Sequence, residues 1–293
     1  MNKGLENVGD ILKRSFQQWQ VHQPSNERKI QHRRASQRYI SYLPTVMTRL
    51  SPFFPVNKRQ MKMDTITEPI IIENPWGKII IRNRRLSIYD ETVLLSLLML
   101  LKKYGSNIFQ TTFYELCKLM NVTPARDTYN AIMKSLIRMS EAHITIEKKV
   151  SSSNSHNAQA EMDGAIIVGI EKTESRKMTL ELHSYLLYSF RDRLITRMDM
   201  KTRSELRGDI SKALYRFYEG QRSECYTISI LKLSQAINVR CDEKMFSLRW
   251  KLRKAIHELE VGGYLRRFIL PDRGQVVAVF KSKNRFLNKW PWE

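Results

Sequence analysis

The stretch Thr112-Phe113-Tyr114-Glu115-Leu116-Cys117-Lys118-Leu119-Met120-Asn121-Val122 has a second, diverged copy later in the chain. The copy reads Ser229-Ile230-Leu231-Lys232-Leu233-Ser234-Gln235-Ala236-Ile237-Asn238-Val239. Each copy begins with a hydroxyl residue that caps helices and ends in a polar turn. A basic amphipathic helix and a β-hairpin pattern follow each copy. This order is typical of a helix-turn-helix with a wing, so the sequence predicts an α+β fold with two tandem winged-helix domains.

The domain boundaries follow from where this pattern begins and ends. Residues 1–60 contain 11 Lys or Arg and 3 Asp or Glu, with few aliphatic residues. Such a segment buries too little apolar surface to offset the entropy of ordering. We therefore predict a basic, mostly flexible N-terminal arm over 1–65, with short helices at 8–20 and 26–41. The first winged-helix domain is expected over 66–190 and the second over 191–293.

Local signals place the elements within each domain. In the first, we expect strands at 70–72 and 78–81, a helix at 91–103 capped by Asp90, a strand at 108–111, and helices opening at Thr112 and at 125. Its wing is predicted from strands at 143–150 and 162–171 around a polar tip at 151–157, and a further strand is expected at 177–182. In the second, we expect a helical stripe from Leu206 to Phe217, a strand at 226–228, helices at 229–237 and 243–261, and hairpin strands at 264–270 and 275–281.

The charge of the chain indicates its class of partner. Its 293 residues carry 50 Lys or Arg against 29 Asp or Glu, a net charge of +21. Nucleic acid is the first candidate for a polyanionic partner and an anionic membrane surface the second. The apolar run from Val93 to Leu101 is shorter than the roughly 20 residues that span a bilayer, and it predicts a buried helix. Three cysteines without a C-x-x-C pair, and no signal peptide, favour a cytoplasmic protein without a membrane partner.

The helix that follows each repeat offers the candidate DNA-binding side chains. In the second, Met245, Leu248 and Leu252 mark a core face, and cationic residues and Trp250 point away from it. Such a face suits the major groove, where Arg and Lys pair with guanine, while basic wing residues reach phosphates. A solvated charged face is the alternative interpretation. The predicted DNA-binding set is Arg126, Asn130, Lys134, Arg138, Ser247, Trp250, Lys251, Arg253, Lys254, Arg266, Arg267, Arg273 and Lys281.

The motifs of catalytic proteins are not found in the sequence. Gly164 and Gly169 have P-loop glycine spacing, but Ile170-Glu171 follow where Lys and Ser or Thr are needed. The six histidines form no H-x-H pair of the kind that a metal-dependent nickase uses, and no ligand spacing for a metal is present. We therefore predict no catalytic residues, no metal site, no cofactor and no enzyme activity.

The residues of the first repeat from Thr112 to Cys117 resemble the TrfA-type family of plasmid replication initiators. Arg207–Tyr218 resembles the helix that precedes that family's second DNA-binding helix-turn-helix. Glu258-Leu259 with Gly262 to Leu265 resembles its connection between helix and wing. The resemblance covers about Arg84 to Leu270. It implies a protein that binds tandem direct repeats (iterons) at an origin, opens AT-rich DNA and recruits the host initiator and replicative helicase. It also implies monomer–dimer exchange.

Two further surfaces are suggested. Members of that family can carry a clamp-binding peptide, and Leu50, Ser51 and Phe53 match it, whereas Arg49 and Pro52 depart from it. The resemblance thus implies a sliding-clamp contact there, and a linker packed against the first module is the alternative. A dimer surface is expected around residues 94–101 and the neighbouring strands. A transcriptional repressor or partition-type DNA-binding protein remains the alternative to an initiator.

Overall fold

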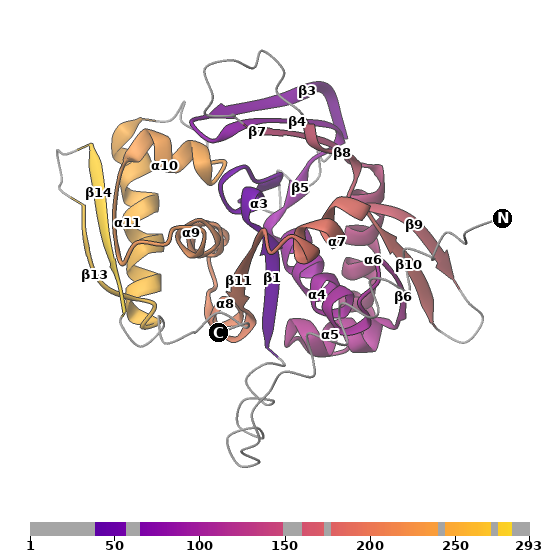
Figure 1. The fold of residues 1–293 in the computed structure, drawn as a ribbon. Coiled ribbons are helices and arrows are strands. Elements are labelled where there is room, and N and C mark those ends of the chain that lie inside the picture. The colour runs from indigo at the N-terminus through magenta and orange to yellow at the C-terminus, as the bar shows by residue number, and fades with distance from the viewer. Residues whose placement is uncertain are drawn as a thin grey trace.

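The computed structural model describes residues 39–56, 65–148, 160–172, 177–239, 244–270 and 275–282. Two helix-turn-helix modules lie on either side of a central two-stranded ribbon, as Figure 1 shows. The ribbon packs against the long first helix of the first module and against the first helix of the second. The fold is therefore α+β, with the predicted repeat present as two separate modules.

The first module contains the helices α4 (Ile88–Tyr104), α5 (Phe113–Met120) and α6 (Arg126–Glu141). Ser87, rather than Asp90, is the N-cap of α4, and Asp90 completes a capping box three residues later. The Thr112 side chain caps α5 by accepting from the Glu115 amide at 3.1 Å, as predicted. The module's three-stranded sheet has the order β6 (Ile108–Thr111), β10 (Met178–Leu182), β9 (Ile167–Lys172).

The second module repeats this arrangement. Its helices are α9 (Asp209–Glu219), α10 (Ile230–Ala236) and α11 (Met245–Val261), and its sheet has the order β12 (Cys225–Ser229), β14 (Val276–Lys281), β13 (Leu265–Ile269). Ser229 caps α10 as Thr112 caps α5. Asn121 and Asn238, the matched asparagines of the repeat, have φ of 56° and 58°. Asparagine tolerates this left-handed conformation better than most residues, which accounts for its recurrence at the turn.

The wing of the first module is not the hairpin that the sequence indicated. In both modules the strand before the second helix pairs with the last strand of the sheet, which gives the matching orders β6-β10-β9 and β12-β14-β13. The wing of the first module is therefore β9–β10. The predicted strand at 162–171 is divided at Ile166 into β8 (Ala160–Ala165) and β9, which join different sheets. The predicted polar tip, 151–157, lies outside the described residues.

The hairpin predicted as the wing forms part of a second sheet instead. This four-stranded sheet has the order β3 (Thr65–Asn74), β4 (Gly77–Arg84), β7 (His143–Lys148), β8. Gly77 starts β4 with φ of 155°, and a Cβ there would lie 2.2 Å from the carbonyl oxygen of Glu147 on β7. Glycine is thus required where β4 and β7 come together. Ile79 and Ile81 of β4 are fully buried, so the sheet contributes to the core of the first module.

Residues 39–56 are folded into the body of the protein, so the prediction of a flexible arm is wrong for this segment. It forms β1 (Ile40–Pro44), α3 (Thr45–Arg49) and β2 (Phe53–Phe54), and we call it the strap. β1 pairs with β11 (Ile195–Asp199) to make the central ribbon, and β2 pairs with β5 (Leu86–Ser87). The helices expected at 8–20 and 26–41 lie outside the described residues, except for residues 39–41, where residue 39 is in a turn and residues 40 and 41 belong to β1.

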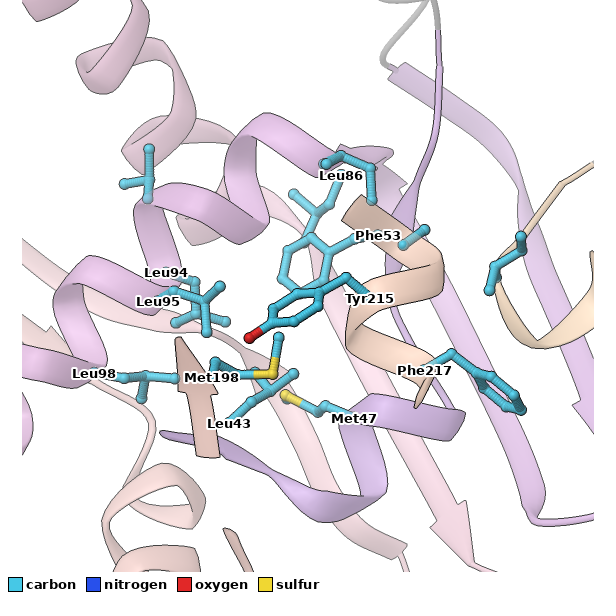
Figure 2. Close-up of a cluster of buried hydrophobic side chains, with 14 of the residues drawn as sticks. Leu43, Met47, Phe53, Leu86, Leu94, Leu95, Leu98, Met198, Tyr215 and Phe217 are labelled. Carbon is cyan, nitrogen blue, oxygen red and sulfur yellow. The ribbon is translucent and has the colours of Figure 1, made fainter. Parts of the chain in front are cut away.

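The strap fills the space between the two modules. Figure 2 shows Leu43, Met47 and Phe53 of the strap beside leucines of α4 and Tyr215 of α9. α3 lies so close to the end of α9 that a Cβ on Gly220 would stand 2.1 Å from the Thr48 hydroxyl. Arg49 also donates to the Gly220 carbonyl at 3.0 Å. The strap therefore joins the modules by apolar packing and by polar contacts at the end of α9.

This packing contradicts two predictions of partner surfaces, the clamp-binding peptide and the dimer surface on α4. Leu50, Ser51 and Phe53, the clamp-like residues, are 1%, 2% and 0% exposed, so a clamp could not reach them without unfolding the strap. The alternative of a packed linker is the one that holds, and the segment packs against both modules. The leucines of α4 that we expected in a dimer surface are buried inside the same chain, as predicted for a core helix but not for an interface.

Asn238 fastens the strap to the second module, and its removal has a predictable effect. Its Nδ2 donates to the carbonyls of Ser51 at 2.7 Å and Phe53 at 3.0 Å. We expect Asn238→Ala to lower the free energy of unfolding by about 2 kcal/mol, because two buried acceptors lose their donor and alanine disfavours positive φ.

The matched control is Asn121→Ala, which changes the equivalent residue of the first repeat at nearly the same φ. Its expected cost is about 1 kcal/mol, from the backbone conformation alone. Both values come from urea unfolding. Equal losses for the two variants would show that the contacts of Asn238 with the strap contribute no stability.

Candidate nucleic-acid interface

The first module presents a polar face on α6. Arg126, Asn130 and Lys134 lie one turn apart and are exposed, as the four-residue spacing predicted. Tyr129 stacks on Phe113 of α5 with ring centroids 5.7 Å apart, which holds α6 against the helix before it. The exposed side chains are thus carried on a helix whose position is fixed by packing, as a precise binding surface requires.

Arg138, the fourth member of this predicted set, has a different role. Its guanidinium forms a bidentate contact with the Asp90 carboxylate, with Nη2–Oδ1 at 2.6 Å and Nε–Oδ2 at 3.2 Å. The Asp90 side chain is fully buried and that of Arg138 is only 12% exposed. Arg138 therefore fastens α6 to the start of α4 and is not part of the exposed face, which corrects its assignment to DNA binding.

The second module presents a larger and more strongly basic face on α11. Leu248, Leu252 and Ile256 are fully buried, so the opposite side of the helix faces outward, as predicted. Trp250 and Lys254 are exposed on that side, and the Lys254 ammonium lies 5.5 Å from the Trp250 ring centroid. Ser247 and Lys251 are partly exposed on the flank of this face. The exposed side of α11 therefore combines cationic and aromatic groups.

A shallow hollow separates α11 from its wing. It has a volume of about 330 Å³ and is lined by Trp250, Arg253, Lys254, His257 and Phe268. Arg253 is exposed on α11, and its Nη2 donates to the carbonyl of Leu270 at 2.9 Å, at the end of β13. Arg253 therefore also fixes the wing relative to α11, which the sequence did not reveal.

The predicted wing residues divide into three groups. Arg266 and Arg267 of β13 are exposed, where phosphates could reach them. Lys281 is buried and donates from Nζ to the Gln221 carbonyl at 2.6 Å. Burial lowers the pKa of Lys281, and the charge of Glu219 opposes this shift. Lys281 is thus an internal donor, which corrects its assignment to the wing surface. Arg273 lies outside the described residues.

Glu258 holds α11 in place through its carboxylate. It accepts from the amides of Arg207 and Gly208 and from the Ser211 hydroxyl, at the start of α9. Burial would raise the pKa of Glu258, but these hydrogen bonds lower it below its usual value. The orientation of α11 is therefore tied to α9, and α9 packs against the strap and α4.

A buried ion triad connects α9 to the first module. Glu91 of α4 pairs with Arg216 of α9 at 2.6 Å and with Arg203 of α8 (Met200–Glu205) at 3.2 Å. All three side chains are at most 1% exposed. Trp76, between β3 and β4, adds an edge-to-face contact with Phe217 of α9 at 5.7 Å. The helices α6 and α11 therefore belong to modules that are packed together and are not joined by a loose linker.

One exposed side chain on α11, that of Phe246, is not among the predicted DNA-binding residues. Phe246 is 80% exposed and lies four residues before Trp250, on the same side of the helix. A helical plot of 245–261 places it opposite the core face, which was the available signal.

Within the described residues, no group of three or more His, Cys, Asp or Glu side chains could hold a metal ion. No helix in this part of the chain is long and apolar enough to cross a membrane.

Comparisons with known proteins found a family and solved structures that are similar to this chain. Residues 77–219, from β4 to the end of α9, match the family described as "Initiator Replication protein, WH1". A crystal structure of domains 2 and 3 of RctB has a TM-score of 0.56 and 11% identity, and the match covers 82% of this chain and 98% of that one. A crystal structure of the Pi initiator protein in complex with iteron DNA has a TM-score of 0.47 and 14% identity, and covers 67% and 91%.

The structural likeness and the family match support different conclusions. No curated protein matches the sequence. At 11% identity the likeness to RctB shows the fold alone, and it extends over both modules. The family match is made by sequence and lies in the first module, the ribbon strand β11 and the helix α9. Residues 77–219 are thus similar to the WH1 domain of initiator replication proteins.

Proposed function

We propose that this protein is a plasmid replication initiator that binds direct repeats (iterons) at a replication origin. The family match of residues 77–219 is the observation that carries this proposal. The finer resemblance to TrfA-type initiators at Thr112–Cys117 points the same way. In this proposal the protein opens adjacent AT-rich DNA and recruits the host initiator and replicative helicase, and it exchanges between monomer and dimer through a surface other than α4.

The two exposed helix faces support a tandem mode of binding. Arg126, Asn130 and Lys134 of α6 would enter one major groove, and the basic face of α11 another. Arg266 and Arg267 on the second wing would contact phosphates, which contribute affinity without sequence preference. Because the strap and the ion triad pack the modules together, the distance between the two contacted grooves is set by the protein. This fixed distance predicts that the repeats in the bound DNA have a constant length.

The alternative is a sequence-specific repressor or partition-type protein with the same fold. Such a protein would bind DNA without opening it, and an initiator that represses its own gene would do both. The arrangement of sites in the DNA distinguishes the two. Tandem direct repeats beside an AT-rich stretch favour initiation, whereas a single inverted repeat over a promoter favours repression.

A footprint of the full-length protein on the DNA flanking its own gene tests the proposal. It is made at physiological salt because phosphate contacts make DNA affinity strongly salt-dependent. Protection of several evenly spaced direct repeats, with distorted bases in adjoining AT-rich DNA, is the expected result. Protection of one palindrome over a promoter without distortion would overturn the proposal in favour of a repressor.

Lys254 provides a test of base reading by α11. We expect Lys254→Ala to weaken binding to the protected repeat by about 1–3 kcal/mol, and binding to random duplex much less, because a base contact is lost. Fluorescence titrations of both duplexes with the purified variant measure the two effects. The control is Lys201→Ala, which removes an exposed lysine of α8 outside both helix-turn-helix units. Equal losses on the two duplexes would reassign Lys254 to phosphate contact.

A further inference from the structure

Two large aromatic side chains are exposed on the outward face of α11. Phe246 is 80% exposed and Trp250 is 58% exposed. Exposure of one large apolar residue is ordinary, but two at a four-residue interval form a stripe along one side of a helix. Lys254 continues the stripe by a further turn and lies over the Trp250 ring.

The charge around this stripe identifies the kind of surface that it fits. Residues 244–257 contain no Asp or Glu, whereas Arg249, Lys251, Arg253 and Lys254 lie among them. The two carboxylates of α11, Glu258 and Glu260, follow near its C-terminal end, where they contact Ser211 and His257. The occupant must therefore be polyanionic and yet offer apolar groups. The major groove of DNA meets both conditions, because each thymine exposes a C5-methyl group between the phosphate backbones.

We infer that Phe246 and Trp250 read thymine methyl groups in the major groove. The inference rests on the proposed function and adds the base that this part of the helix selects. Phe246 lies in the first turn of α11, the part of a recognition helix that contacts base edges. Four residues advance a helix by about 6 Å, which is close to two base-pair steps of about 3.4 Å. The two rings thus select two thymines about two base pairs apart, while the neighbouring cations bind guanines or phosphates.

The test removes the methyl group and nothing else. A duplex carrying one protected repeat is made with each thymine replaced in turn by deoxyuridine, and the affinity of the full-length protein for each duplex is measured. We expect about a fourfold loss at one or two positions, since a buried methyl group contributes roughly 0.8 kcal/mol. Loss at no position would overturn the inference.

Variants of the protein assign each methyl group to its ring. Each methyl-sensitive position in the DNA is assigned to the side chain whose removal abolishes its sensitivity. Phe246→Ala should bind duplexes with thymine or uracil equally at one of these positions. At the other position, which Trp250 contacts, thymine should still be preferred. Val261→Ala removes another exposed apolar side chain at the far end of the same helix and should behave as the unmodified protein. Full methyl dependence at every position in both Phe246→Ala and Trp250→Ala would overturn the inference.

The outcome also separates this inference from the proposed function. Selective binding to the repeat without any dependence on thymine methyl groups would overturn only the inference about thymine, and the proposed function would stand. A protein that binds the repeat no better than a scrambled duplex would overturn the proposed function, and this inference with it.

Discussion

Replacement of Glu91 by glutamine is expected to lower the free energy of unfolding by about 3–5 kcal/mol, since it leaves two buried cations without their counter-ion. Arg203 and Arg216 both pair with this carboxylate, and neither guanidinium has access to water. Two nitrogens of Arg216, Nε and Nη2, are buried without a hydrogen-bond partner among the described residues. Burial lowers the pKa of Arg216, and the neighbouring carboxylate of Glu91 partly opposes this shift. The charge of Glu91 is therefore the main compensation for burying Arg216.

Urea unfolding of the full chain measures this loss. The control is Glu141→Gln, which breaks an ion pair with Arg84 at 2.6 Å whose side chains are 44% and 30% exposed. An exposed pair contributes at most about 1 kcal/mol, so the control should change stability little. A similar small effect for both variants would mean that the triad does not hold the modules together.

A second large effect is expected from Leu43→Ala in the strap. Leu43 is fully buried and, with Met198 and the leucines of α4, belongs to the apolar cluster in Figure 2. Shortening it leaves a cavity between the modules, so the free energy of unfolding should fall by about 4 kcal/mol. The same urea titration measures it. A truly flexible arm, as the composition of residues 1–60 suggested, would show no such sensitivity.

Tyr39→Ala is the matched control, because Tyr39 immediately precedes β1 and its side chain is 45% exposed. We expect it to change the stability by less than about 1 kcal/mol. If Leu43→Ala were equally mild, the strap would be only loosely held, and the clamp-like residues beside it would again be available to a partner.

Much of each helix-turn-helix module was predictable because its signals are local. Capping residues at Thr112 and Ser229 and the 3.6-residue period of α11 determine structure within a few turns of the chain. The strap was not predictable in this way. All five residues of β1 are buried only because β11, α4, α7 (Ser184–Arg191) and α8 surround them, and no nearby residue signals those partners.

The candidate interface shows the same limit. Helical spacing placed Arg126, Lys134 and Lys254 on outward faces, and the structure agrees. The same spacing could not distinguish Arg138 from the exposed residues of α6. Arg138 follows Lys134 by four residues, but its partner, Asp90, lies on another helix. Alternation likewise predicted a strand through Ile166 without showing that its two halves join different sheets. Contacts between distant segments decided each of these cases.

The pairing of β1 with β11 has a consequence for how the chain matures during synthesis. β1 leaves the ribosome early, but the strand that completes its ribbon, Ile195–Asp199, is made only after the whole first helix-turn-helix. Until then Leu94, Leu95 and Leu98 of α4 lack part of their cover, and such exposed apolar surface favours aggregation. A fragment cut at residues 66 and 190 would lack both ribbon strands permanently. The first module is thus one copy of the repeated sequence pattern but not an independent folding unit.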